Sequence, residues 1–185
     1  FSILYYKRPP TDEFAVEKLA LPGFCPFTLV EDQPLHRRHV RTQDMKPGGD
    51  FLTGRRMMLV NADVQISLCK PTDPPKQFFS NGDGDELYFI KEGSGHVESV
   101  YGILPFRKLD YVLIPKSTPH RVHLDANMGV MLVFEGRPYL GIPGEYRNAY
   151  GQLTDYAPFS HRDFRLPAEL LTFDAKKHGA GPYPV

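Results

Sequence analysis

The sequence has no excess of charge, no long apolar run and almost no cysteine. Lysine and arginine total 22, and aspartate and glutamate also total 22. Without a net positive field, the chain is not drawn to nucleic acid or to an anionic membrane surface. No window approaches the roughly 18 uninterrupted apolar residues of a transmembrane helix, and no charged start precedes an apolar signal core. We therefore expect a cytoplasmic protein, with neither nucleic acid nor a membrane among its partners.

The two cysteines, Cys25 and Cys69, are too few for a disulfide framework. Cys69 ends the alternating run 64–69, which predicts a strand, and we expect a packed thiol rather than a reactive one. A chain of 185 residues fits one domain, and it buries about 70% of the surface that its unfolded form exposes. It therefore needs neither disulfides nor metal to fold.

Tryptophan is absent, whereas proline, glycine and phenylalanine are frequent, with 18, 16 and 13 residues respectively. Proline and glycine in such numbers interrupt the chain often, and the aromatic and β-branched residues between them favour short strands. The composition therefore predicts an all-β protein whose strands are joined by well-defined turns.

The stretch 80–124 contains the clearest strand pattern. Its apolar run 87–90 ends at Gly93 and Gly95, which can take the positive φ angles of a hairpin turn. Residues 96–101 form the predicted return strand. Further strands are predicted at 110–114, at 120–124 and, after a turn at 125–129, at 130–134. We expect these strands to form a meander.

The spacing within this stretch resembles the two sequence motifs of the cupin superfamily. Glu86 and Gly93 match the glutamate and the closing glycine of the first motif. The second motif has a proline, a small residue two positions later and a histidine three positions beyond that. Those positions are held by Pro115, Ser117 and His120. The resemblance implies an all-β, cupin-like jelly-roll barrel.

The first motif would place its two histidines at Ser80 and Gly82, and neither residue is a useful metal ligand. Glu86 and His120 are thus what remains of a degenerate ligand set. An Fe(II) site normally needs two histidines and one carboxylate on one face. We therefore expect no catalytic, cofactor-binding or metal-binding residue in this chain, with Glu86 and His120 satisfied by hydrogen bonds in the barrel mouth.

A metal held by Glu86 and His120, with help from His123 or another histidine, stays an alternative. Successive side chains of a strand point to opposite faces. His120, Val122 and Leu124 share one face, so His123 points to the other. This geometry counts against His123 as a ligand.

The chain divides into three parts by composition. Residues 1–33 form a predicted amino-terminal arm, with a strand at 1–6 and a short helix at 11–19. Residues 34–143 form the cupin-like β-barrel. Residues 144–185 form an irregular extension rich in tyrosine and arginine, and such segments commonly pack against another surface. Neither end looks like a natural terminus, so we expect a fragment whose extension leads to a second cupin half.

Over most of residues 34–167 the sequence resembles the amino-terminal half of homogentisate 1,2-dioxygenases. The matching segments are 34–38, 50–54, 78–85, 112–115, 135–136 and 162–167. The resemblance implies an iron(II) enzyme of tyrosine and phenylalanine breakdown, which opens the ring of homogentisate with molecular oxygen to give maleylacetoacetate. It further implies two cupin-like halves, trimers that pair into hexamers, and an iron site of two histidines and a glutamate in the carboxy-terminal half alone.

The function that follows depends on the length of the natural protein. In a longer protein, this segment is the non-catalytic barrel of a ring-cleaving dioxygenase, which acts on homogentisate or on a related acid such as gentisate. In a protein that ends near Val185, it is a metal-free cupin that serves as a binding or assembly module. A small metal-dependent cupin enzyme is the third alternative.

Overall fold

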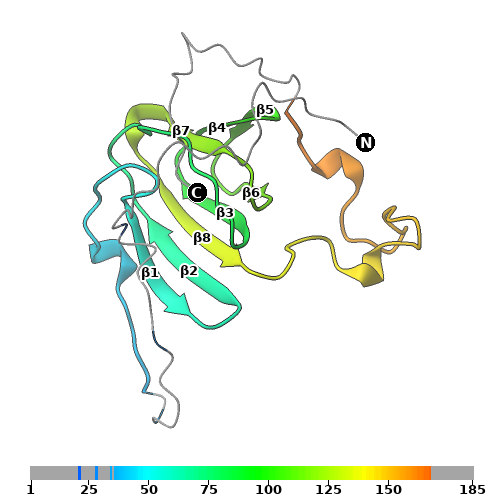
Figure 1. The fold of residues 1–185 in the computed structure, drawn as a ribbon, viewed down its shortest axis with the longest axis horizontal. Coiled ribbons are helices and arrows are strands. Elements are labelled where there is room, and N and C mark those ends of the chain that lie inside the picture. Colours follow the sequence, from blue (N-terminus) through cyan, green and yellow to red (C-terminus); the bar gives the residue numbers. More distant parts are fainter. Residues whose placement is uncertain (1–20, 22–27, 29–33, 35, 168–185) are drawn as a thin grey trace.

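The computed structural model describes residues 21, 28, 34 and 36–167, and in this part of the chain the fold is all-β (Figure 1). The strands are β1 Arg55–Val60, β2 Val64–Cys69, β3 Asp85–Glu92, β4 Gly95–Ser99, β5 Gly102–Phe106, β6 Tyr111–Ile114, β7 His120–Leu124 and β8 Val130–Gly136. The helices are single 3₁₀ turns, η2 Thr42–Asp44, η3 Asp125–Asn127, η4 Gly144–Tyr146 and η5 His161–Asp163. No helix of the described residues is long and apolar enough to cross a membrane.

The strands form two antiparallel sheets. The larger sheet has the order β1-β2-β8-β3-β6, and the smaller sheet has the order β5-β4-β7. Four of the six neighbouring pairs join strands that are not consecutive in sequence: β2 with β8, β8 with β3, β3 with β6, and β4 with β7. This strand order, with the last strand returning to the middle of the first sheet, is that of a cupin-like jelly roll. It confirms the predicted fold class.

The predicted meander is wrong, because the chain changes sheet at four of its connections: between β3 and β4, β5 and β6, β6 and β7, and β7 and β8. β3 pairs with β6 and β8 in the larger sheet, whereas β4 pairs with β5 and β7 in the smaller one. Gly93 does take a positive φ of 98°. Gly95 serves close packing instead, since a Cβ there would lie 1.9 Å from the His123 carbonyl oxygen. Glycine marks a sharp turn, but it does not say whether the next strand returns to the same sheet.

The core lies between the two sheets, and the alternation of each strand decides which side chains enter it. On β3, Glu86, Tyr88 and Ile90 are buried inside the barrel, while Leu87 and Phe89 are only partly buried on the other face. The buried apolar cluster consists of Phe51, Leu52, Cys69, Phe79, Tyr88, Ile90, Val97, Phe106, Val112, Ile114, Val122, Met131 and Val133. Both sheets contribute to it, so the barrel has a single core.

Among the other predicted elements, the strand at 64–69 is confirmed as β2. Cys69 is fully buried, burial raises the pKa of its thiol to about 12, and the predicted packed thiol is confirmed. The sequence pattern missed β1 and β5. Cys25, the arm strand and the arm helix lie outside the described residues.

The part of the extension that the structure describes, residues 144–167, is held mainly by its own hydrogen bonds and leads away from the sheets in Figure 1. Ser160 and Asp163 form a capping box around η5, and Arg147 forms an isolated bridge with Leu153. An ion pair between Arg165 and Asp110 ties the extension to the barrel. The predicted domain limits stay predictions.

Candidate functional site

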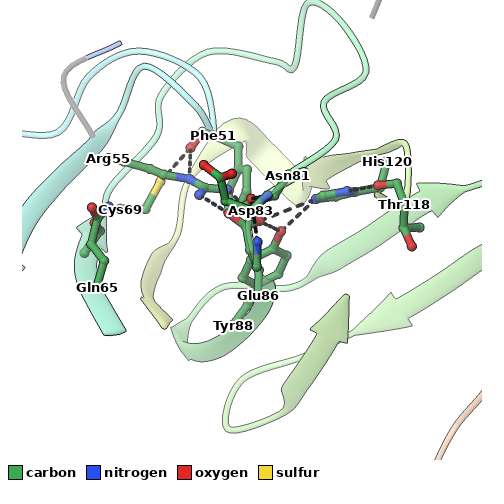
Figure 2. A network of polar contacts seen from close by, with 12 residues as sticks. Phe51, Arg55, Gln65, Cys69, Asn81, Asp83, Glu86, Tyr88, Thr118 and His120 are labelled. Carbon is green, nitrogen blue, oxygen red and sulfur yellow. Dashed lines mark hydrogen bonds and ion pairs between the residues drawn. The ribbon is translucent and has the colours of Figure 1, made fainter. Parts of the chain in front are cut away.

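The two degenerate ligand positions meet inside the barrel. Glu86 is the second residue of β3 and His120 is the first residue of β7, so they come from different sheets. Glu86 Oε2 lies 3.9 Å from His120 Nε2, and each side chain is 1% exposed. Figure 2 shows His120 and Thr118 on one side of Glu86, and Arg55 and Cys69 on the other. The cupin spacing therefore did identify two side chains that lie together.

Arg55, the first residue of β1, pairs with Glu86. Its Nη1 donates to Glu86 Oε1 at 2.5 Å, and its Nη2 donates to Oε2 at 3.2 Å. The guanidinium also lies over the Phe51 ring, with its central carbon 4.4 Å from the ring centre. A planar guanidinium matches a carboxylate in this two-point geometry, which a lysine ammonium does not reproduce.

Burial and ion pairing shift the pKa values of Glu86 and Arg55 in opposite directions. Burial alone would raise the pKa of Glu86, but the charge and hydrogen bonds of Arg55 outweigh burial and hold that pKa below its usual value. Burial would likewise lower the pKa of Arg55, yet Glu86 raises it above its ordinary value. The pair is therefore ionised on both sides. A buried pair of this kind depends on its geometry, because each charge has given up its water.

Tyr88 lies between the carboxylate and the imidazole. Its hydroxyl donates to Glu86 Oε2 and lies 2.7 Å from His120 Nε2. His120 Nδ1 is 2.8 Å from the Thr118 carbonyl oxygen, which can only accept, so Nδ1 carries a hydrogen. Burial lowers the pKa of His120, which favours the neutral ring. A neutral ring with Nδ1–H presents the lone pair of Nε2 to Tyr88, whose single hydrogen then faces two acceptors.

Asn81 and Glu135 complete the surroundings of Glu86. Asn81 Nδ2 donates to Glu86 Oε1 at 3.3 Å, and Asn81 Oδ1 accepts from the backbone of Asp83 and Gly84. Glu135 of β8 stands opposite Glu86 in the strand register. Burial and the charge of Glu86 raise the pKa of Glu135. This side of the barrel therefore holds two carboxyl groups of different character. Pairing with Arg55 keeps Glu86 ionised, whereas burial and the charge of Glu86 favour the protonated form of Glu135.

The residues at this position do not fit an Fe(II) ion. They supply one carboxylate and one imidazole, where such a site normally needs two histidines and a carboxylate. Both oxygens of Glu86 already accept hydrogen bonds from Arg55, and Oε2 accepts one from Tyr88 as well. Within the described ranges, no group of three or more His, Cys, Asp or Glu side chains is placed to hold a metal ion.

His123 does not join this network, as the period-two pattern predicts. Its ring stacks on His96, with centroids 4.6 Å apart, and its Nε2 lies 3.1 Å from Glu98 Oε2. Arg121 Nε donates to the same oxygen at 2.7 Å. These four residues form a second cluster, on the face of the smaller sheet opposite Val122. We refer to it below as the outer cluster.

Sequence reasoning missed Arg55 and Tyr88, which make the closest contacts to Glu86. Tyr88 was identifiable in principle, because it follows Glu86 by two residues and so shares its face of β3. Arg55 gave no such signal. Its partner lies 31 residues away, and β2 and β8 separate their strands in the sheet.

Comparison with known proteins identifies a relative by sequence. No family model matches the sequence. A protein of Saccharolobus solfataricus that is described as a "Putative dioxygenase" is 29% identical over 177 residues, which are 94% of this chain and 44% of that protein. The chain therefore spans less than half the length of this curated relative.

Solved structures with a similar fold are more distant. A cupin-2 domain containing protein of Shewanella frigidimarina is 19% identical, with a TM-score of 0.40 over 45% of this chain and 79% of that one. A cupin superfamily protein of Desulfitobacterium hafniense is 20% identical, with a TM-score of 0.40 over 44% of this chain and 74% of that one. Scores at this level carry no argument about function. The cupin-like barrel is shown by the strand order of this chain, and the sequence is similar to 44% of a protein described as a dioxygenase.

Proposed function

We propose that this chain is the non-catalytic amino-terminal barrel of a longer Fe(II) ring-cleaving oxygenase of the homogentisate 1,2-dioxygenase type. The whole enzyme would open homogentisate with molecular oxygen to give maleylacetoacetate, in the cytoplasm. Three findings support the proposal: the residue segments shared with that family, the dioxygenase relative that matches nearly the whole chain, and the relative's greater length. Iron would be held by two histidines and a glutamate in a second barrel.

The buried ion pair of Arg55 and Glu86 is the observation that carries the non-catalytic part of the proposal. Both side chains are 1% exposed, and Arg55 Nη1 lies 2.5 Å from Glu86 Oε1. A positive charge at this distance repels a divalent cation and uses the lone pairs that would bind it. The carboxylate of this barrel is therefore already neutralised by the chain itself, and the role left to the barrel is that of a scaffold.

The proposal is tested first by the intact mass and the oxygen uptake of the natural protein. We expect a mass near twice 21.0 kDa, iron in the purified protein, and oxygen consumption with homogentisate. Chelation should abolish the uptake, and Fe(II) should restore it. Gentisate serves as the substrate control, and uptake with gentisate alone would move the proposal to a related dihydroxylated acid. A mass near 21.0 kDa with no iron would overturn it.

His120→Ala separates a scaffold from an iron site. We expect this variant to keep the iron content and turnover of the intact protein, because the iron lies in the other barrel. His96→Ala, which changes a histidine of the outer cluster, is the matched control. Loss of bound iron in His120→Ala, with iron retained in the control, would contradict the scaffold role.

A binding or assembly module is the second candidate, and the exposed aromatic rings of the carboxy-terminal part favour it. Tyr139, Tyr150 and Tyr156 are 74%, 90% and 91% exposed, the last two within the extension. Tyrosine rings and arginine are enriched at protein interfaces. We expect a homo-oligomer, a trimer or a hexamer, whose subunits use this part. Light scattering on the natural protein tests it, and a monomer at all concentrations would count against this role.

A further inference from the structure

The interior network connects the same parts of the barrel that a bound metal ion would connect. Glu86 comes from β3 and His120 from β7, the strands that carry the two cupin motifs. Arg55 adds β1, which is separated from β3 by two strands of the larger sheet. Figure 2 shows the contacts converging on Glu86 from both sides. The network therefore ties the two sheets together through one carboxylate.

His120 keeps the orientation of a metal-binding histidine. Such histidines nearly always donate their second ring N–H to a carbonyl or carboxylate, which fixes the ring and points the other nitrogen at the metal. Here Nδ1 lies 2.8 Å from the Thr118 carbonyl oxygen, and Nε2 faces Tyr88 and Glu86. The ligand framework has thus been kept, although two of the usual histidines are missing.

A cation already occupies this framework. We propose that the Arg55 guanidinium takes the place of a divalent metal ion, and that its removal leaves Glu86, Tyr88 and His120 able to bind one. The proposal rests only on the metal-free part of the proposed function, and it holds or fails whether or not the whole protein cleaves aromatic rings.

The surroundings of Arg55 are built for an organic cation. The central carbon of its guanidinium lies 4.4 Å from the ring centre of Phe51, 5.4 Å from that of Phe79 and 5.9 Å from that of Tyr88. Its Nε donates to the Phe51 carbonyl oxygen at 3.4 Å. Aromatic faces attract a desolvated guanidinium. The three aromatic rings and the Glu86 carboxylate together suit the arginine guanidinium better than a hydrated metal ion.

Arg55→Met tests the proposal, because methionine keeps an unbranched, flexible side chain but removes the guanidinium and its charge. We would titrate Co²⁺ into the wild type and the variant of the same chain, and follow the visible absorption of bound Co²⁺ and the metal content. We expect one more Co²⁺ per chain in Arg55→Met than in the wild type, so that metal held elsewhere in the protein cancels. Saturating Co²⁺ should also raise the Tm of the variant, since a ligand that binds only the folded state stabilises it.

Two control variants make the result specific. Arg56→Met removes the neighbouring arginine, whose Nη1 donates to backbone carbonyls of Thr53 and Arg55, and it should gain no Co²⁺. Arg55→Met combined with His120→Ala should lose the gain. A folded Arg55→Met that takes up no extra Co²⁺ would overturn the proposal. So would Co²⁺ uptake by the wild type that His120→Ala abolishes.

Arg55→Met leaves Glu86 buried without its counter-charge, so it can fail to fold. In that case the variant is refolded with and without Co²⁺, beside Arg55→Met combined with Glu86→Gln, in which both charges are gone. Rescue of the single variant by Co²⁺, with no effect of Co²⁺ on the double variant, supports the proposal. A single variant that stays unfolded with Co²⁺, whether or not the double variant folds, contradicts it.

Discussion

The barrel contains two clusters with the same chemical groups, one in its interior and one on its outer face. The interior network joins Arg55, Glu86 and His120, and the outer cluster joins Arg121, Glu98 and the histidines His96 and His123. In both, an arginine binds a glutamate beside an imidazole. The side chains of Arg55 and Glu86 are 1% exposed, whereas those of Arg121, Glu98 and His123 are 20%, 10% and 30% exposed.

This difference in burial changes what the same groups do. Water reaches Arg121 and His123 in the outer cluster, so the ion pairs of Glu98 are partly screened and solvent can replace a lost partner. In the interior no solvent can replace a lost partner, and each charge depends on the other. The interior network can therefore hold the two sheets in one arrangement. The outer cluster lies on the surface of the smaller sheet alone, and we expect it to add little to stability. Three predictions test this contrast.

The largest effect is expected from removing one interior charge. Glu86→Ala leaves the Arg55 guanidinium buried without its carboxylate, and the free energy of unfolding should fall by about 3–5 kcal/mol. For a chain of this size, that corresponds to a fall in Tm of roughly 6–20 °C. Urea unfolding of the variant and the wild type measures the difference.

Glu98→Ala is the matched control in the outer cluster. Its arginine and histidine partners keep access to water, so we expect a loss of about 1 kcal/mol or less. Equal losses in Glu86→Ala and Glu98→Ala would show that burial does not distinguish the two clusters. Adding Arg55→Met to Glu86→Ala should restore part of the stability, because the unpaired charge is then removed.

The sequence located one half of the interior network and missed the other half for a physical reason. Glu86 and His120 each follow from the spacing of one short motif, which is encoded within a single strand and the turn beside it. Arg55 begins β1, whose register shifts between Met57 and Leu59, so the inward and outward residues do not alternate evenly along it. An irregular strand gives no period-two signal, and the pairing of Arg55 with a distant strand is a property of the folded sheet.

The fold class was predicted for a similar reason, and the strand connections were not. Short β-branched and aromatic runs between turn residues identify most of the strands. The turns at Gly93 and at 125–129 read as hairpins, because local sequence encodes a change of direction. The partner of the strand after each turn is set by packing between the two sheets. Register and sheet order therefore came from the structure alone.

An intermediate effect is expected from pH, through the histidines. Burial lowers the folded-state pKa of both His120 and His123 below the ordinary value of 6.5. Between that value and the lowered one, the unfolded chain binds a proton that the folded chain does not, so stability falls as the pH falls below about 6.5. The slope is at most about 1.4 kcal/mol per pH unit for each proton.

His120→Gln and His123→Gln tell which cluster causes the pH dependence. His120 is nearly fully buried and faces the charges of Arg55 and Glu86 together with the Tyr88 hydroxyl, whereas His123 is partly exposed. We expect His120→Gln to flatten the dependence of Tm on pH between about 7.5 and 5.5 more than His123→Gln does. A larger flattening in His123→Gln would place the main pH response on the outer face.

The smallest effect is expected in the outer cluster, and salt should remove it. Arg121→Met breaks the contact of Arg121 Nε with Glu98 Oε2 and the stacking of its guanidinium on Phe78. The loss should be roughly 0.2–1 kcal/mol at low ionic strength. At about 1 M salt the screening length falls to about 3 Å, so the electrostatic part of the loss should shrink.

The loss in Glu86→Ala should stay nearly constant over the same range, because salt does not reach a pair that is 1% exposed. If both losses fall together as salt is added, solvent reaches the interior network, and the two clusters differ only in position.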